Sequence, residues 1–154
     1  MIPRLVRNVN LSASLVYALT IVHHVYGAIV FDTPWRYHAA YLGVAGIGAT
    51  LLLTWGSTRG GPSALKRAAK ALLAALTLIL AVGLIGVFEG AYNHAIKLLL
   101  FFGGAAPATM RRLFPPPTYE MPSDVLFEAT GVLQFVAGLI AARASVALWR
   151  DRRG

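Results

Sequence analysis

Four long apolar stretches constrain this chain more than any other feature of its sequence. They cover approximately residues 9–31, 37–55, 71–98 and 124–149. About 20 apolar residues in a helix cross the hydrocarbon core of a bilayer, and a helix is favoured because lipid offers the backbone no hydrogen-bond partner. The stretches are continuous and do not alternate, which argues against a β-barrel. We therefore predict an all-α, polytopic membrane protein: a four-transmembrane-helix bundle in a single integral membrane domain, residues 1–154.

The composition supports this class and removes several kinds of chemistry. The chain is 57% hydrophobic and 13% charged, whereas soluble domains carry about 25% charged residues. It contains no cysteine, so disulfides, thiolate metal ligands and a cysteine nucleophile are excluded. No G-x-S-x-G sequence and no glycine-rich phosphate loop is present. The sequence alone leaves open whether the protein is an enzyme.

The basic residues indicate an orientation. Most of them flank the first stretch, fill the loop between the second and third, or follow the fourth: Arg4, Arg7, Arg59, Lys66, Arg67, Lys70, Arg150, Arg152 and Arg153. Fewer lie in the other two loops: Arg36, Arg111 and Arg112. The positive-inside rule then places both termini in the cytoplasm.

This distribution also explains the net charge of +8 without nucleic acid, because anionic lipid attracts such basic segments. We expect a bacterial or archaeal cytoplasmic membrane (a cell inner membrane). Membrane lipid is the expected partner, with other membrane subunits or a homo-oligomer left open.

The third stretch is longer than one crossing requires, since its apolar character continues to Gly104. Four polar side chains interrupt it: Glu89, Asn93, His94 and Lys97. A long helix that tilts and projects outward and a helix that breaks near Gly90 both fit. In either case we expect Lys97 to extend to the lipid headgroups.

The loop over residues 103–123 contains five prolines: Pro107, Pro115, Pro116, Pro117 and Pro122. It is either a lid or binding surface or a stiff polyproline connector. Ser123 is expected to cap the fourth helix, near whose N-terminus negative charge is favoured.

Ionisable residues gather toward the outer side of this predicted topology. They are five of the six acidic residues and all four histidines: Asp32, Glu89, Glu120, Asp124, Glu128, His23, His24, His38 and His94. Such groups are costly in lipid and usually mark a functional site. On the first helix, His23 and His24 share a face with Thr20 and Gly27, because the four follow an i, i+3, i+4, i+7 pattern.

Imidazole and carboxylate groups at one depth on facing helices are typical of a site for a divalent transition metal such as Zn, Cu, Fe or Mn. The predicted ligands are His23, His24, His38, Glu89, His94 and Glu128. His38 is either a ligand or a residue that positions one. Glu89 and His94 are five residues apart, about 140° around an ideal α-helix, so they meet only if the helix bends or their side chains wrap around it.

Structural roles compete with metal binding at each of these positions. His23 and His24 could be hydrogen-bonded core residues, His38 an interfacial residue, Glu89 half of a buried ion pair with His94 or His24, and Glu128 a charge at a helix N-terminus.

Four functions follow from these alternatives. The first is a membrane protein with an outward-facing His/Glu metal site, used for redox chemistry or metal handling. A noncatalytic accessory subunit of a larger complex is the second. The third is a b-type haem subunit ligated by His23 or His24 together with His94. A proton relay ranks last, because no polar chain is evident from the site to the cytoplasmic side.

Overall fold

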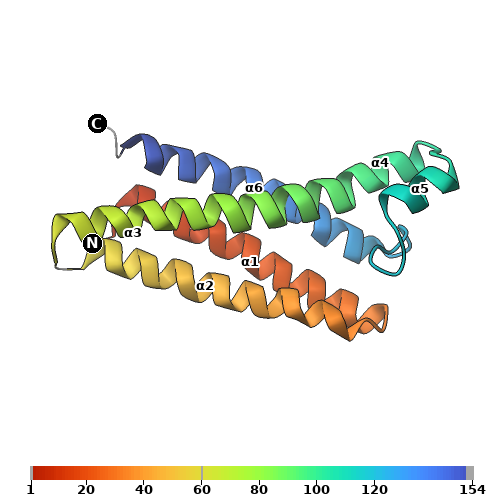
Figure 1. The fold of residues 1–154 in the computed structure, drawn as a ribbon, viewed down its shortest axis with the longest axis horizontal. Coiled ribbons are helices and arrows are strands. Elements are labelled where there is room, and N and C mark those ends of the chain that lie inside the picture. Colours follow the sequence, from red (N-terminus) through yellow and green to blue (C-terminus); the bar gives the residue numbers. More distant parts are fainter. Residues whose placement is uncertain (1, 60, 152–154) are drawn as a thin grey trace.

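A computed structural model describes residues 2–59 and 61–151 of the chain as a set of packed helices (Figure 1). In chain order the elements are α1 (Arg4–Val30), the 3-10 turn η1 (Pro34–Arg36), α2 (Tyr37–Thr58), α3 (Ser63–Leu76), η2 (Thr77–Ile96), α4 (Lys97–Phe102), α5 (Pro107–Leu113) and α6 (Val125–Asp151). Arg152 and Arg153, part of the predicted cytoplasmic charge, lie outside the described residues.

The prediction of an all-α chain with four apolar helices is confirmed within the described part of the chain. The helices long and apolar enough to cross a membrane are α1, η1 with α2, the continuous run α3–η2–α4, and α6. Both α1 and α6 have 27 residues, about 40 Å at 1.5 Å per residue, against a hydrocarbon core of about 30 Å.

The long helices lie side by side, and the turns that connect them lie at the two ends of the bundle (Figure 1). The two termini and the turn between α2 and α3 lie at one end. The turn between α1 and α2, the short helices α4 and α5, and the start of α6 lie at the other. The ionisable residues singled out in the sequence gather at this second end.

The third apolar stretch forms one continuous helical run of 40 residues, Ser63–Phe102, so the long-helix alternative is correct and the helix does not break at Gly90. Its central section, η2, is a π-helix of 20 residues. Hydrogen bonds from i to i+5 widen the turn, so that residues five apart point in more similar directions than they do in an α-helix. This winding brings Glu89 and His94 to the same face of the helix.

Close packing of η2 against α6 depends on glycines on both helices. A Cβ at Gly138 would lie 2.8 Å from the Cα of Gly86, and one at Gly131 would collide with the ring of His94. A Cβ at Gly90 would collide with the backbone nitrogen of Phe135. Small residues at such spacings let membrane helices approach closely. Gly86 and Gly90, four residues apart in the sequence, are spaced as in such helix contacts.

The glycines of α2 behave in two ways. A side chain at Gly43 would meet Ile21, and one at Gly46 would meet the ring of Tyr17, so both permit α2 to pack against α1. Gly48 has nothing within 4 Å of its Cβ direction. Gly48 therefore has no part in helix contact.

The interior contains two apolar clusters with polar side chains between them. One cluster is centred on Ala13, Ala81 and Ala141 and the other on Val9 and Leu148. Where the helices pass from one cluster to the other, each carries a buried polar residue: Asn10, Thr50, Thr77 and Ser145. Polar side chains are thus present below the site, but Nδ2 of Asn10, Oγ1 of Thr77 and Oγ of Ser145 have no hydrogen-bond partner in the described part of the chain, so these residues do not form a connected chain.

The glycine contacts give a test of the packing. We expect Gly138→Ala to lower the free energy of unfolding by about 1–3 kcal/mol, because its methyl group would press on the backbone of η2. Gly48→Ala is the matched control: it adds the same methyl group to an open helix face and is expected to be neutral or to stabilise by up to about 1 kcal/mol. Thermal unfolding of the detergent-solubilised protein measures both, and equal effects would contradict the packing described.

Candidate metal centre

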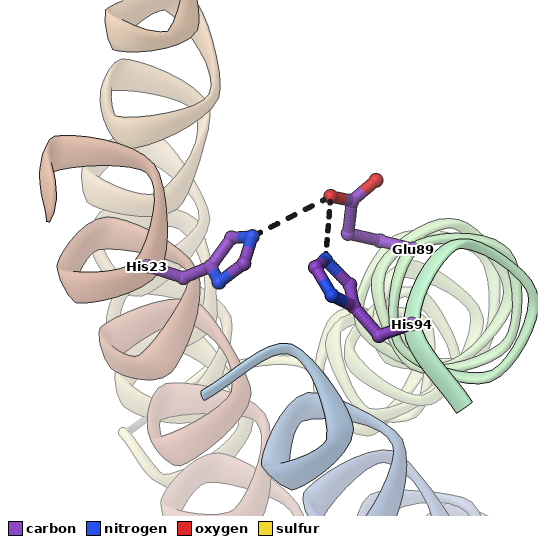
Figure 2. A group of neighbouring side chains, drawn as sticks. All are labelled: His23, Glu89 and His94. Carbon is purple, nitrogen blue, oxygen red and sulfur yellow. Dashed lines mark ion pairs between the residues drawn. The ribbon is translucent and has the colours of Figure 1, made fainter. Parts of the chain in front are cut away.

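Three of the predicted ligands lie together between α1 and η2. A ligand atom from each of His23, Glu89 and His94 lies within 4.8 Å of the other two, so the group could hold a metal ion. Figure 2 shows the three side chains pointing toward one another, His23 from α1 and the other two from η2. Both histidines are buried, whereas the Glu89 side chain is 20% exposed. The group is therefore enclosed by protein on the histidine side and open on the carboxylate side.

The geometry around the carboxylate of Glu89 is unusual for hydrogen bonding. The Nε2 atoms of His23, His24 and His94 all lie 3.7 Å from one oxygen, Oε1. A hydrogen bond between nitrogen and oxygen has a length of about 2.7–3.2 Å. Two ligands of one tetrahedral ion, each about 2.0–2.1 Å from it, lie about 3.4 Å apart. The observed separations are closer to the spacing of ligands than to that of hydrogen-bonded partners.

The ring of His94 is oriented by a carboxylate on its far side. Its Nδ1 lies 2.7 Å from Oε2 of Glu128, and the other oxygen of Glu128 lies 2.8 Å from Nζ of Lys97. With the proton on Nδ1 donated to the carboxylate, the Nε2 lone pair faces Glu89. A carboxylate in this position fixes the tautomer of a metal-binding histidine and raises its basicity.

Lys97 does not extend to the headgroups, so that expectation is wrong. Its side chain is 2% exposed, and Nζ also donates a 2.8 Å hydrogen bond to the backbone oxygen of Glu120. The reason is that α6 places Glu128 within reach, and a buried charge needs a partner. Glu128 is thus more than a charge at a helix N-terminus, since it links Lys97 to His94.

His23 is oriented by a hydroxyl group. Its Nδ1 lies 3.0 Å from Oγ1 of Thr130 on α6. The Thr130 hydroxyl already donates to the backbone oxygen of Leu126 at 2.9 Å, so it accepts the Nδ1 proton of His23. The Nε2 atom of His23 is buried without a hydrogen-bond partner in the described part of the chain. Its lone pair is consequently free and directed at the Glu89 carboxylate.

Glu89 is held from its own helix. Asn93 donates a 2.8 Å hydrogen bond from Nδ2 to Oε2 of Glu89. That bond leaves Oε1 as the oxygen that faces the three imidazoles. The i, i+4 pair therefore fixes which oxygen is presented to the group.

The remaining predicted ligands lie at the edge of the group. His24 approaches Glu89 but is not among the three residues with mutually close ligand atoms. His38 is exposed, stacks on Trp35 with ring centroids 6.0 Å apart, and forms its hydrogen bond with the backbone oxygen of Trp35. Its side chain still borders the cavity beside Glu89. α2 thus contributes a side chain to the lining of the cavity, and Nδ1 of that side chain faces Trp35.

The loop over residues 103–123 folds back over the site, and it is not a simple extended connector. It contains the helix α5, and Tyr92 donates a 3.0 Å hydrogen bond to the backbone oxygen of Leu113. Residues 118–120, which we call the strap, border the cavity at Glu89. Arg36 fastens the strap through an ion pair with Glu120 at 3.4 Å.

The start of α6 is capped differently from the prediction. The backbone N–H of Phe127 donates a 2.8 Å hydrogen bond to Oδ1 of Asp124, so Asp124, and not Ser123, caps the helix. The other oxygen of Asp124 accepts a 3.0 Å hydrogen bond from Tyr26. This bond joins the start of α6 to α1 one turn from His23. It thereby helps to keep His23 beside Thr130 of α6.

A haem ligated by His23 and His94 does not fit this geometry. Two axial histidines must lie on opposite sides of a porphyrin plane. The rings of His23 and His94 are in edge-to-face contact with centroids 4.6 Å apart, and Phe127 stacks on His23 at 4.1 Å. Because these rings touch one another, no space for a macrocycle separates them.

Comparison with known proteins adds no family to this description. No protein-family model, no curated protein and no solved structure matches the chain. What the protein does must therefore be argued from the geometry of the site.

Sequence reasoning missed the residues that position the ligands. Thr130 gave no signal, because its role depends on how α6 rotates against α1. Arg36 was counted as a loop charge, although it is 4% exposed and its guanidinium lies 5.2 Å from the ring centroid of Phe127. The position of Lys97, three residues after His94, was the one available signal, since those residues share a helix face.

The buried ion pair gives a second test. We expect Lys97→Met to lower the free energy of unfolding by about 3–5 kcal/mol, because it leaves the Glu128 carboxylate without its cation. Combining it with Glu128→Gln should recover part of the loss. Arg112→Met removes an exposed cation at the same end and serves as the control. Chemical unfolding monitored by tryptophan fluorescence measures the set, and a Lys97 effect equal to that of Arg112 would contradict the pairing.

Proposed function

We propose that this chain is an integral membrane protein that holds one divalent transition metal ion between His23, Glu89 and His94. The observation that carries the proposal is the set of imidazole Nε2 atoms, each 3.7 Å from one oxygen of Glu89. His24 lies at the same distance from Glu89 but at the edge of the group, and a fourth ligand position stays open. Glu128 and Thr130 then act by orienting the ligands.

Charge favours a metal over a simple ion pair. A buried carboxylate needs a positive partner, and Arg36 and Lys97 are already paired with Glu120 and Glu128. A proton shared between Glu89 and one histidine would shorten one contact to hydrogen-bond length and leave the others long. An ion located between the residues accounts for the similar distances from all three.

The ligand set restricts the metal. Imidazole nitrogen suits Zn, Cu, Fe and Ni, whereas Mg and Ca prefer oxygen ligands. Two histidines and one carboxylate with an open position are typical of catalytic zinc and of non-haem iron(II) sites. We therefore rank zinc and iron(II) first. An open position facing a cavity favours a reactive or metal-handling site over a purely structural one.

The distribution of basic residues supports an outward-facing site. At the end that holds the metal group, Arg36 and Lys97 are buried in ion pairs. The exposed basic residues of that end are then Arg111 and Arg112 within the described ranges. The opposite end carries Arg4, Arg7, Arg59, Lys66, Arg67, Lys70 and Arg150. By the positive-inside rule the termini face the cytoplasm.

Metal analysis tests the proposal directly. After loading with Zn(II) or Fe(II) and removal of excess metal, the purified protein should retain about one ion per chain, as measured by inductively coupled plasma mass spectrometry. We expect Glu89→Ala and His94→Ala to lower retention at least tenfold, because each removes a ligand. His38→Ala should retain the metal, since its nitrogen faces Trp35. Wild-type protein without stoichiometric metal, or equal retention in all variants, would refute the site.

The positioning of His23 gives an independent test. Thr130→Val removes the hydroxyl that accepts the Nδ1 proton of His23 while keeping the size of the side chain. Loss of such a partner typically lowers metal affinity by about 10–100-fold. Thr50→Val is the matched control, because Thr50 is also a buried threonine but bonds only to the backbone of Ile47. Competition with a metal-sensitive dye measures both affinities, and an unchanged value for Thr130→Val would contradict this role.

A further inference from the structure

The carboxylate side of the metal group opens into a cavity of about 140 Å³. Its wall includes Glu89 and His94, the buried cations Arg36 and Lys97, and Tyr119 of the strap. Arg36 and Lys97 are 4% and 2% exposed. Because both cations are paired with carboxylates, the total charge around the cavity decides which ligand it suits.

The formal charges around this cavity can be counted. Glu89, Glu120 and Glu128 are negative and Arg36 and Lys97 are positive, so the five groups sum to −1 with neutral histidines. A divalent ion at the proposed centre changes the sum to +1. An uncompensated charge in a low-dielectric interior is costly. One monovalent anion bound at the open position restores neutrality.

The size of the cavity limits that anion. A buried cavity of about 150 Å³ holds one benzene molecule, so the space beside Glu89 accepts about six heavy atoms. Azide, formate and acetate fit within this limit, whereas a phospholipid or a quinone ring with its substituents exceeds it. The strap covers part of the cavity, which further restricts the room for a larger anion beside Glu89.

Donors are available to hold such an anion. Burial raises the pKa of the Tyr119 phenol, and the nearby Glu89 carboxylate acts in the same direction. The hydroxyl is therefore protonated at neutral pH and can donate a hydrogen bond. Arg36 contributes a guanidinium whose Nε donates to Thr33 at 2.8 Å. That bond and the ring of Phe127 fix its orientation at the cavity wall.

We propose that the metal centre takes a small monovalent anion as its exchangeable ligand, with Arg36 supplying the adjacent positive charge. This inference rests on the proposed metal site. The anion is a carboxylate, a pseudohalide or hydroxide, which share one negative charge and a small lone-pair donor. The protein would thus select by charge and size among molecules that could reach the ion.

The test uses the full-length protein in detergent, loaded with Co(II), whose visible bands report a change of ligand. Azide, formate and acetate should shift the bands with saturation, and benzoate, with nine heavy atoms, should bind at least tenfold more weakly. Bands unmoved by azide and formate in fully loaded protein would overturn the inference while leaving the metal site intact. Failure to bind Co(II), Zn(II) and Fe(II) would overturn the metal site itself.

Two substitutions separate charge from structural damage, because both break the ion pair between Arg36 and Glu120. Arg36→Gln removes positive charge and should raise the azide dissociation constant about tenfold, whereas Glu120→Gln removes negative charge and should lower it by a similar factor. Arg36→Lys keeps the charge and should change it less than threefold. Effects of the same sign for Arg36→Gln and Glu120→Gln would overturn the role of Arg36.

Discussion

The carboxylate of Glu89 is the group on which the rest of this structure depends. It lies in an apolar helix, where a negative charge needs a positive partner. The cations within reach, Arg36 and Lys97, are held by Glu120 and Glu128, and imidazole nitrogens surround the oxygen that Asn93 leaves free. The nitrogens of His23 and His94 are turned toward Glu89 by hydrogen bonds on the far sides of their rings, whereas Nδ1 of His24 has no hydrogen-bond partner in the described part of the chain. The surrounding residues are therefore arranged so that a cation could bind at Glu89.

Backbone geometry makes this arrangement possible. In an α-helix Glu89 and His94 would point in different directions, but the i to i+5 hydrogen bonds of η2 bring them to one face. Gly131 on α6 leaves room for the ring of His94, which a methyl group would occupy. The same helix then supplies Glu128 and Thr130 to the two histidines. The site is consequently a product of how η2 and α6 pack, and not of either helix alone.

The sequence predicted the spans and the end of the bundle at which the ionisable residues gather, because both follow from hydropathy and from the cost of charge in lipid. It could not predict the winding of η2, since the choice between i+4 and i+5 hydrogen bonds depends on tertiary packing. The role of Thr130 was hidden for a similar reason, as helix rotation decides its neighbours. Lys97 was expected at the headgroups because its partner on α6 lies 31 positions further along the chain.

One lysine connects access to the site with the geometry of a ligand. His23 lies seven residues before the end of α1, about 10 Å along the helix, so an ion bound there would exchange with solvent through the cavity beneath the strap. Lys97 donates to the backbone of Glu120 in that strap and also pairs with the Glu128 carboxylate that orients His94. Movement of the strap must break the first bond or carry Lys97 with it. In the second case the charge facing Glu128 changes, and opening the cavity would then alter the environment of His94; in the first case the ion pair between Lys97 and Glu128 stays intact.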